Sequence, residues 1–302
     1  MARLEVKIGN VVMKNPVTTA SGTFGFGKEM AEVFDLSLLG AITVKGTSVE
    51  PWLGNPTPRI CETPAGMLNA IGLQNDGAEA FLAEKLPFLR RFDSPLIDTI
   101  VGHSVEEYVK VAEMLGGAEG VDAFEINVSC PNVSRGFLAF GTSVEGITEI
   151  VKAVKGATDK TVITKLSPNV TDIVSLAEAA VKAGSDALSL INTLLGTSID
   201  AKTRKFRLAN VTGGLSGPAV KPVALRMVYD VARAVDAPVI GMGGIVTAED
   251  ALEFLLAGAT AVAVGTGTFV NPAAAIDIID GIDKYLDENG FEDVKEIIGI
   301  VS

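Results

Sequence analysis

A thiol stands in a short polar segment that directly follows an apolar run. Residues 126–132 read Ile-Asn-Val-Ser-Cys-Pro-Asn, so Asn127 and Cys130 come where a predicted strand ends. Pro131 stops ladder pairing there, because proline has no N–H to donate. A partly ionised cysteine can remove a carbon-bound proton near neutral pH, which makes Cys130 a candidate catalytic base. A lone cysteine at a strand end is more often a small buried side chain, so the other strand ends must decide.

Two lysines also stand at the ends of apolar runs. Lys45 follows Ala41–Val44, and Lys165 is the penultimate residue of Val162–Leu166. Burying an ammonium group is costly unless an anion or an electron-rich ring compensates it. Either lysine alone could be the structural partner of a buried carboxylate. Two lysines that face one end of a fold favour a bound ligand instead.

Glycines cluster after the last two predicted strands. Residues 241–245 read Gly-Met-Gly-Gly-Ile, and residues 265–268 read Gly-Thr-Gly-Thr. Such loops expose backbone N–H groups, and a helix that begins near Thr247 adds its positive end, so together they suit a phosphate. Neither these glycines nor the run Gly22–Gly27 fits the Rossmann dinucleotide fingerprint. A flavin mononucleotide (FMN), anchored by one phosphate, therefore fits this chain better than NAD.

Eight short apolar runs alternate with helical segments along the chain. Most runs are continuously apolar, as expected of parallel strands covered on both faces. They are Val17–Ala20, Ala41–Val44, Ile97–Val101, Ala123–Val128, Val162–Leu166, Ala187–Ile191, Pro238–Met242 and Ala261–Val264. Capping-box patterns begin at Ser104, Thr142 and Thr247, and they predict that helices start there, between consecutive apolar runs.

Eight strand–helix units with right-handed crossovers predict an α/β fold, a closed (β/α)8 TIM barrel. A doubly wound open sheet is the main alternative, but it would need fewer strands or a second domain. Leu4–Ile8 and Val11–Met13 flank the turn signal Gly9-Asn10, which predicts a hairpin across one end of the core. No linker or low-complexity run divides the chain, so we expect one domain over residues 1–302.

Two connections are too long for simple turns. They span residues 46–74 and 192–218, and we expect them to cover the mouth formed by the C-terminal strand ends. Asn69, Asn127 and Asn192 would reach that mouth, and their carboxamides match a flat substrate with alternating N–H and C=O groups. The basic residues of the second connection are interpreted as a solvated loop; they are Lys202, Arg204, Lys205 and Arg207.

Composition excludes several classes of protein. The chain has 302 residues and a formal net charge of −12, so nucleic-acid binding, which needs a basic face, is not expected. Two cysteines can form neither a disulfide framework nor the four thiolates of an iron–sulfur cluster. Charged residues near the N-terminus replace the apolar stretch of a signal peptide, which predicts a cytoplasmic protein. The single histidine, His103, is interpreted as solvent-facing or helix-capping, and no metal site is predicted.

The motifs resemble those of the dihydroorotate dehydrogenases, specifically the soluble class that uses a cysteine base. The resemblance covers nearly the whole chain, through residues 21–27, 55–59, 66–75, 127–132, 165–169, 191–193, 213–218 and 241–244. It implies an FMN-bearing barrel that oxidises (S)-dihydroorotate to orotate in pyrimidine synthesis. Cys130 would remove the C5 proton while C6 delivers hydride to the flavin.

The resemblance also implies which residues bind each ligand. The substrate would be held by Lys45, Asn69, Ala70, Ile71, Gly72, Leu73, Asn127, Asn192 and Thr193. FMN would be held by Ser21, Lys45, Gly46, Thr99, Asn127, Lys165, Ile191, Gly217, Gly243, Gly244, Gly265 and Thr266. Lys165 would face the flavin ring and favour its reduced anion. Thr99 is a departure, since family members usually have asparagine there, and a hydroxyl loses the second contact that an amide could make.

Motif details are closer to the NAD-linked subclass than to the fumarate-reducing one. The resemblance then implies a partner subunit that carries FAD and a 2Fe-2S cluster, in a heterotetramer with two copies of each chain. A homodimer that reduces fumarate is the nearest alternative. A more distant one is an aldolase-type barrel in which Lys165 or Lys45 forms a Schiff base. A barrel that only binds a phosphorylated metabolite is a third, and it would leave Cys130 and both lysines without a purpose.

Overall fold

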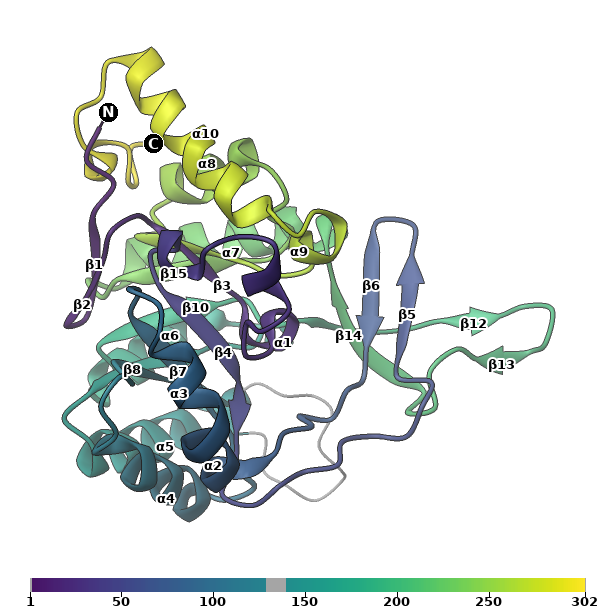
Figure 1. Cartoon of the computed structure of the whole chain (residues 1–302). Helices are drawn as coiled ribbons and strands as arrows, with labels where there is room; N and C mark the ends of the chain where they lie inside the picture. Colours follow the sequence, from purple (N-terminus) through teal and green to yellow (C-terminus); the bar gives the residue numbers. More distant parts are fainter. Residues whose placement is uncertain (1, 129–139, 302) are drawn as a thin grey trace.

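The computed structural model describes residues 2–128 and 140–301, and its centre is an eight-stranded parallel sheet. The strands run in the order β3-β16-β15-β10-β9-β8-β7-β4 (Figure 1). Their bounds are β3 Val17–Thr19, β4 Ile42–Thr47, β7 Leu96–Ile100, β8 Ala123–Asn127, β9 Thr161–Lys165, β10 Ala187–Leu190, β15 Val239–Met242 and β16 Ala261–Val264. Each overlaps one of the eight predicted apolar runs, so the predicted TIM barrel is confirmed.

Threonine side chains bridge the seam between the first and last strands of this sheet. Thr18 Oγ1 donates to the carbonyl of Ala41 at 2.9 Å. Thr19 Oγ1 donates to the carbonyl of Thr43 at 2.9 Å and accepts from the Thr43 N–H at 3.0 Å. These bonds satisfy backbone groups that would otherwise form an open edge, which is why the barrel closes.

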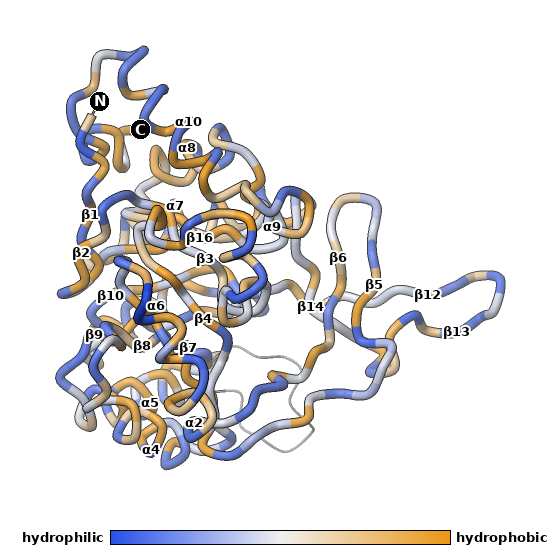
Figure 2. Tube along the Cα trace, viewed as in Figure 1, coloured by the Kyte–Doolittle hydropathy of each residue, from blue (hydrophilic) through white to orange (hydrophobic). Residues whose placement is uncertain are grey.

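Helices surround the barrel and supply the outer half of its core. The longer ones are α4 Val105–Gly116, α5 Val144–Ala157, α6 Ile173–Lys182, α7 Lys221–Ala234, α8 Ala248–Leu256 and α10 Ala274–Asn289. Short ones are α1 Ser21–Phe24, α2 Gly77–Ala80, α3 Leu86–Leu89 and α9 Gly267–Val270. In α4 the buried residues Tyr108, Val111, Ala112 and Leu115 follow the helical period, and Figure 2 shows apolar residues gathered inside with hydrophilic turns outside.

Single helical turns complete the helical elements of the described residues. Five are 3₁₀ turns, η1 Met30–Glu32, η2 Leu36–Leu38, η4 Phe140–Thr142, η5 Pro218–Val220 and η6 Val294–Glu296; η3 Phe81–Lys85 is a π turn. No helix among the described residues is long and apolar enough to cross a membrane.

Polar caps set the starts of three helices. Thr247 and Asp250 form the predicted capping box of α8, with Thr247 Oγ1 accepting from the Asp250 N–H at 3.2 Å. Ser104 caps α4 as predicted. The prediction for α5 was wrong by one residue, because Ser143 rather than Thr142 accepts from the backbone of the first turn, at 3.1 Å from the Gly146 N–H. These caps satisfy N–H groups that have no partner within the helix.

The predicted N-terminal hairpin closes one end of the barrel. Strands β1 Val6–Ile8 and β2 Val11–Met13 pair antiparallel around Gly9-Asn10. The Asn10 N–H donates to Thr161 Oγ1 at 2.9 Å, where β9 begins. Gly9 has φ of +57° there, and a Cβ would lie 2.6 Å from the Thr161 side chain. The hairpin therefore seals the N-terminal strand ends and leaves the C-terminal mouth for a ligand.

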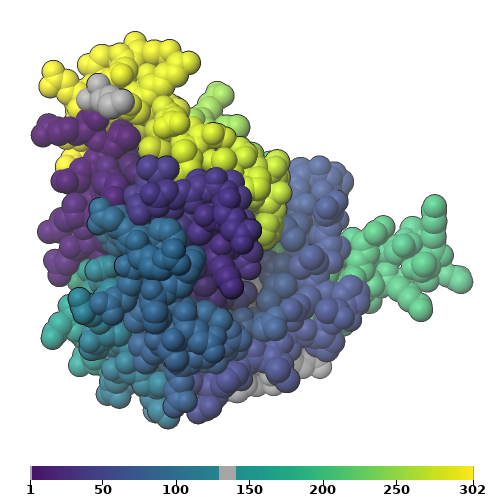
Figure 3. All heavy atoms as spheres, viewed as in Figure 1, coloured from purple at the N-terminus to yellow at the C-terminus, as the bar shows by residue number. Residues whose placement is uncertain are grey.

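A second sheet lies over the mouth, in the order β11-β14-β6-β5. The strands are β5 Ile60–Thr63, β6 Gly66–Asn69, β11 Leu194–Thr197 and β14 Thr212–Ser216, and all pairs are antiparallel. The two long connections predicted as loops thus pair with each other, through β6 and β14. A small hairpin of β12 Ile199–Asp200 and β13 Lys205–Phe206 extends from this sheet (Figures 1 and 3), with the four basic residues of the second connection exposed, as interpreted.

Candidate active site

A cavity of about 780 Å³ lies between the C-terminal strand ends and the covering sheet. It is lined by every described residue that the sequence assigned to substrate or FMN, except Ala70 and Thr99. The lining members of that set are Ser21, Lys45, Gly46, Asn69, Ile71, Gly72, Leu73, Asn127, Lys165, Ile191, Asn192, Thr193, Gly217, Gly243, Gly244, Gly265 and Thr266. Residues from distant parts of the chain therefore share one chamber, as a barrel mouth requires.

Cys130, the predicted base, lies outside the described residues. Asn127, the last residue of β8 and three positions before it, lines the cavity. The Tyr108 hydroxyl of α4 donates to the carbonyl of Asn127 at 2.8 Å and fixes the end of that strand. The role of Cys130 stays a prediction.

Lys165 is paired with a buried carboxylate at the floor of the cavity. Its Nζ lies 3.1 Å from Glu125 Oε1, and both side chains are almost completely buried. Glu125 Oε1 also accepts from Thr99 Oγ1 at 3.0 Å, and Oε2 accepts from Ser189 Oγ at 2.8 Å. The carboxylate is thus held by three donors, which offsets the cost of burying it. Lys165 is both the structural partner of a carboxylate and a cavity residue.

The Thr99 hydroxyl points to this carboxylate. Thr99 is fully buried within β7 and is not among the residues that line the cavity. Ala70 is also fully buried, in a small cluster with Leu68 and Leu208 under the covering sheet. The Ala70 N–H donates to the carbonyl of Arg59 at 2.7 Å and its carbonyl accepts from Asn55 Nδ2 at 2.9 Å, so the role predicted for Ala70 in substrate binding stays a prediction.

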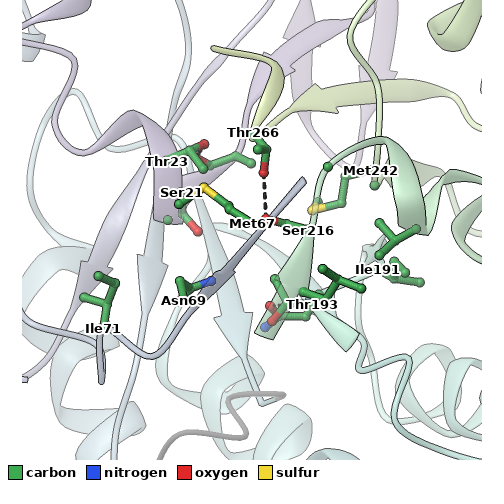
Figure 4. Close-up of a pocket in the computed structure, with 18 of the residues that line it drawn as sticks. Ser21, Thr23, Met67, Asn69, Ile71, Ile191, Thr193, Ser216, Met242 and Thr266 are labelled. Atoms are coloured by element: carbon green, nitrogen blue, oxygen red, sulfur yellow. Dashed lines mark hydrogen bonds between the residues drawn. The ribbon is translucent and has the colours of Figure 1, made fainter. Parts of the chain in front are cut away.

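Three carboxamides line the cavity, and this set, here called the wall of carboxamides, is oriented by hydrogen bonds within the protein; its members are Asn69, Asn127 and Asn192. Asn192 Nδ2 donates to Asn127 Oδ1 at 3.2 Å, and the Thr193 N–H donates to Asn192 Oδ1 at 2.7 Å. Asn69 Nδ2 donates to the carbonyl of Gly214 at 3.4 Å, from β6 to β14. Figure 4 shows Asn69 and Thr193 in the same chamber as Ser21, with the sulfur atoms of Met67 and Met242 nearby. The wall can donate and accept hydrogen bonds to a planar polar ligand.

Four glycines line another side of the cavity, near the starts of α7, α8 and α9; they are Gly217, Gly243, Gly244 and Gly265. Gly217, Gly243 and Gly244 have φ of +97°, +129° and +81°, which only glycine adopts without cost. A Cβ at Gly265 would meet only Ala20 at 3.5 Å and Thr23 Oγ1 at 4.0 Å, so that space is open. Thr266 Oγ1 donates to Ser216 Oγ at 2.7 Å across its edge (Figure 4). Backbone N–H groups and open space at helix starts fit a phosphate group.

Comparison with known proteins decides the family. A family model described as "Dihydroorotate dehydrogenase" matches residues 3–286. The chain belongs to this family. The "Dihydroorotate dehydrogenase B (NAD(+)), catalytic subunit" of Geotalea uraniireducens is 58% identical over 98% of this chain and 97% of its own length. Proteins of the same name from Alkaliphilus oremlandii and Geobacter sulfurreducens are also 58% identical, over 97% and 98% of this chain and 97% of each relative. The dihydroorotate dehydrogenase resemblance is confirmed.

Sequence reasoning missed several residues that line the cavity or hold a lining residue in place. Glu125 was overlooked, although a lone charge within the apolar run Ala123–Val128 is a visible signal. The cavity residues from the covering sheet and from α9 were also missed; they are Ile60, Cys61, Glu62, Met67, Leu215, Ser216 and Phe269. Nothing in their local pattern indicates that the two connections pair.

His103 lies away from the cavity lining and stacks on Trp52, with ring centroids 4.0 Å apart and planes 17° from parallel. Its backbone N–H donates to Glu107 Oε2 at 2.7 Å, just before α4. Within residues 2–128 and 140–301, no three His, Cys, Asp or Glu side chains form a group that could hold a metal ion.

Proposed function

We propose that this chain oxidises (S)-dihydroorotate to orotate in pyrimidine synthesis, as the FMN-containing catalytic subunit of an NAD-linked dihydroorotate dehydrogenase. The observation that carries the proposal is one cavity that joins two lysines, three asparagines and a glycine cradle. The proposal is also supported by relatives 58% identical over nearly their whole length, whose names give this activity.

The cavity residues fit FMN. Gly243, Gly244, Gly265 and Thr266 would hold the phosphate, because they offer backbone N–H groups near helix starts and Gly265 leaves open space there. Ser21, Gly46, Asn127, Ile191 and Gly217 would complete the binding site. When bound, FMN would accept the hydride from C6 of dihydroorotate. Lys165, fixed by Glu125 at 3.1 Å, would place a positive charge where the reduced ring gains negative charge.

The substrate would lie against the wall of carboxamides. Asn69, Asn127 and Asn192 can donate to and accept from the alternating N–H and C=O groups of the dihydroorotate ring. Lys45 would bind its carboxylate, and the backbone of residues 70–73 with Thr193 would close the other side. An analogue that lacks one ring N–H or C=O would leave a buried amide unpaired, so this wall would set specificity.

Cys130 would take the C5 proton from the substrate. It follows Asn127, a cavity residue, by three positions, so a short loop can bring the thiol to the substrate. A general base contributes about 10²–10⁴-fold to the rate of such a step. We place the reaction in the cytoplasm, where free thiols stay reduced.

Electrons would leave through a second subunit. The relatives are named catalytic subunits of an NAD(+) enzyme, which implies a partner in those proteins. For this chain we propose a partner that carries FAD and a 2Fe-2S cluster, in a heterotetramer with two copies of each chain. The nearest alternative, a homodimer that reduces fumarate, shares the same cavity and differs only in the acceptor.

Orotate formation with different acceptors tests this proposal. The chain would be purified alone and from its native extract with any bound subunit. We expect the complex to contain FAD and iron and to form orotate with NAD, and the isolated chain to be inactive with fumarate. Fumarate turnover by the isolated chain would favour the homodimer. A borohydride-trapped substrate adduct in a flavin-free protein would favour the aldolase-type barrel instead.

A further inference from the structure

The cavity segment Ile71–Leu73 has an unusual backbone. Gly72 has φ of +74°, and Leu73 has φ of +55° although it carries a side chain. The left-handed conformation costs a residue other than glycine roughly 1–2 kcal/mol. All three residues line the cavity. Some other group must therefore hold this segment in place, because the segment does not prefer its own conformation.

Asn75 is the group that holds it. Its Nδ2 donates to the carbonyl of Leu73 at 2.9 Å. Its Oδ1 accepts from the Ser48 N–H at 3.2 Å, from Ser48 Oγ at 2.9 Å and from the Gly77 N–H at 2.9 Å. Asn75 is buried, with 6% of its surface exposed. One carboxamide thus joins the end of β4, the start of α2 and the cavity segment.

The backbone of Asn75 is equally constrained. Its N–H donates to the carbonyl of Trp52 at 3.1 Å, and its carbonyl accepts from the Trp52 N–H at 2.9 Å. Trp52 stacks on His103, just before α4. Asn75 is therefore held by its backbone as well as by its side chain, and the Trp52–His103 contact links it to the segment before α4.

Asn55 supports the same segment from its other side. The Asn55 N–H donates to the carbonyl of Ile71 at 2.9 Å, and Asn55 Nδ2 donates to the carbonyl of Ala70 at 2.9 Å. A Cβ at Gly72 would lie 2.7 Å from Asn55, so the two backbones are in close contact. The carbonyls of Ile71 and Leu73 are both bound by the protein, so the N–H groups of the same two trans peptides, which belong to Gly72 and Gln74, point away from Asn55 and Asn75.

We infer that Asn75 is a positioning residue for substrate: by holding the Leu73 carbonyl it keeps the Ile71–Leu73 backbone shaped to receive the ligand. The inference rests on the proposed function for the substrate role of this segment. A positioned segment lowers the cost of ordering on binding, so Asn75 controls affinity for dihydroorotate and orotate. It does not touch the reacting atoms, and the rate of the chemical step stays the same.

The substitution Asn75→Asp isolates this contact. Aspartate has the same shape and keeps an oxygen for the three accepted hydrogen bonds. It loses the N–H that Leu73 needs and places a second oxygen against the Leu73 carbonyl. Asn15→Asp is the matched control, because Asn15 is also buried, accepts from the Val17 N–H at 3.1 Å and donates to the carbonyl of Leu38 at 2.9 Å. Asn15 precedes β3, at the opposite end of the barrel from the cavity.

The experiment measures orotate affinity, steady-state kinetics and amide exchange on the FMN-loaded enzyme. For Asn75→Asp we expect orotate affinity to fall and KM to rise, each by about ten-fold, which is the effect of losing one buried hydrogen bond. The value of kcat should change by less than about two-fold. The Asn55 amide, which donates to the Ile71 carbonyl, should exchange faster without any ligand present. Asn15→Asp should change none of these. If Asn75→Asp does not fold, Ser48→Ala should give a smaller shift in the same direction, because it removes a hydroxyl that Asn75 Oδ1 shares with the Glu50 carbonyl at 2.6 Å and keeps the Ser48 N–H donor.

Wild-type affinity and wild-type Asn55 exchange in Asn75→Asp would overturn the inference. A fall in kcat with unchanged KM would also overturn it, because that is the signature of a residue acting in the chemical step. If the unmodified enzyme neither binds orotate nor oxidises dihydroorotate, the proposed function is wrong. The exchange rate at Asn55 then decides by itself whether Asn75 positions the segment.

Discussion

Glu125 and Lys165 form an ion pair inside a barrel whose other core residues are mostly apolar. Neither group is in contact with bulk water, and the attraction between them offsets a desolvation cost that is large for each ion alone. Thr99 and Ser189 supply the remaining hydrogen bonds of the carboxylate, at 3.0 and 2.8 Å. The pair fixes the Lys165 ammonium at the cavity, which a solvent-exposed lysine could not achieve.

Glu125→Gln tests how strongly the pair is coupled to folding. The change leaves the buried ammonium without a counter-charge, so the free energy of unfolding of the FMN-free protein should fall by about 3–5 kcal/mol. Urea unfolding measures it. Glu288→Gln is the control, because its pair with Lys284 at 3.7 Å is exposed and should contribute about 0–1 kcal/mol. Equal stability of both variants would show that the buried pair is not coupled to folding.

Asp98 is a second buried carboxyl, and its proton is part of the folded state. Thr47 Oγ1 donates to its Oδ1 at 3.0 Å, and Oδ2 has no hydrogen-bond partner among the described residues. Burial raises the pKa of Asp98 well above its usual value, against the smaller lowering effect of the Thr47 hydrogen bond. The folded protein therefore keeps this proton at pH values where the unfolded chain releases it.

Asp98→Asn should remove a pH dependence of stability. Folding raises the pKa of Asp98, so its protonated form stabilises the folded protein. This stabilisation is complete below the usual aspartate pKa and is lost as the pH rises toward the pKa of Asp98 in the folded protein. The loss amounts to about 1.4 kcal/mol per pH unit within that window. The variant should be more stable than the wild type at neutral pH, with a flatter profile in urea unfolding from acid to neutral pH. Parallel profiles for the two proteins would contradict the assignment.

At the scale of elements, the barrel and its cover differ in how far the sequence predicts them. The eight barrel strands are continuous apolar runs, and each is paired with neighbours that the topology dictates. The covering sheet depends on pairs such as Leu68 with Leu215, which are far apart in the chain. Short strands with mixed polarity and distant partners carry no local signal, so they were predicted as loops.

The same difference applies to the candidate site. Residues at barrel strand ends, such as Lys45 and Lys165, were found because strand ends converge in space. Glu125 lies inside a strand and acts through its neighbour, and Met67 reaches the cavity only through the covering sheet. The resemblance predicted a flavin contact for Thr99, but the Thr99 hydroxyl donates to Glu125. For Glu125, Met67 and Thr99, the direction of the side chain within its strand determines whether it reaches the cavity. The sequence pattern does not give that direction.

Gly265→Ala tests the glycine cradle between β16 and α9. The added Cβ meets only Ala20 at 3.5 Å and Thr23 Oγ1 at 4.0 Å, so the variant should fold normally. Its methyl group would occupy the space proposed for the phosphate, and FMN affinity should fall by about ten-fold or more. Equilibrium dialysis with FMN and thermal unfolding without it separate the two effects. Gly117→Ala, which also has open space but lies at the end of α4, should leave FMN binding unchanged. Normal FMN affinity in Gly265→Ala would place the phosphate elsewhere.

The two ends of the barrel differ in structure: one is sealed by a hairpin, and the other holds the cavity. The hairpin of β1 and β2 seals the N-terminal strand ends, and the covering sheet encloses the cavity at the other end (Figure 1). The chain carries a net charge of −12, which repels an anionic substrate at long range. In the proposed function, the Lys45 ammonium at the cavity would offset this repulsion for bound dihydroorotate, whereas the charge of Lys165 is already paired with Glu125. The single domain over residues 1–302 stays a prediction.

Anaerobic titration of the flavin-loaded chain with dihydroorotate tests the central claim most directly. Each equivalent of dihydroorotate should reduce one bound flavin and release one orotate, without any partner subunit. In Cys130→Ser the flavin should stay bound while its reduction slows by about 10²-fold or more near neutral pH, because a hydroxyl is a much weaker acid than a thiol. A flavin that stays oxidised in the wild-type protein, or is reduced equally fast in both proteins, would contradict the account.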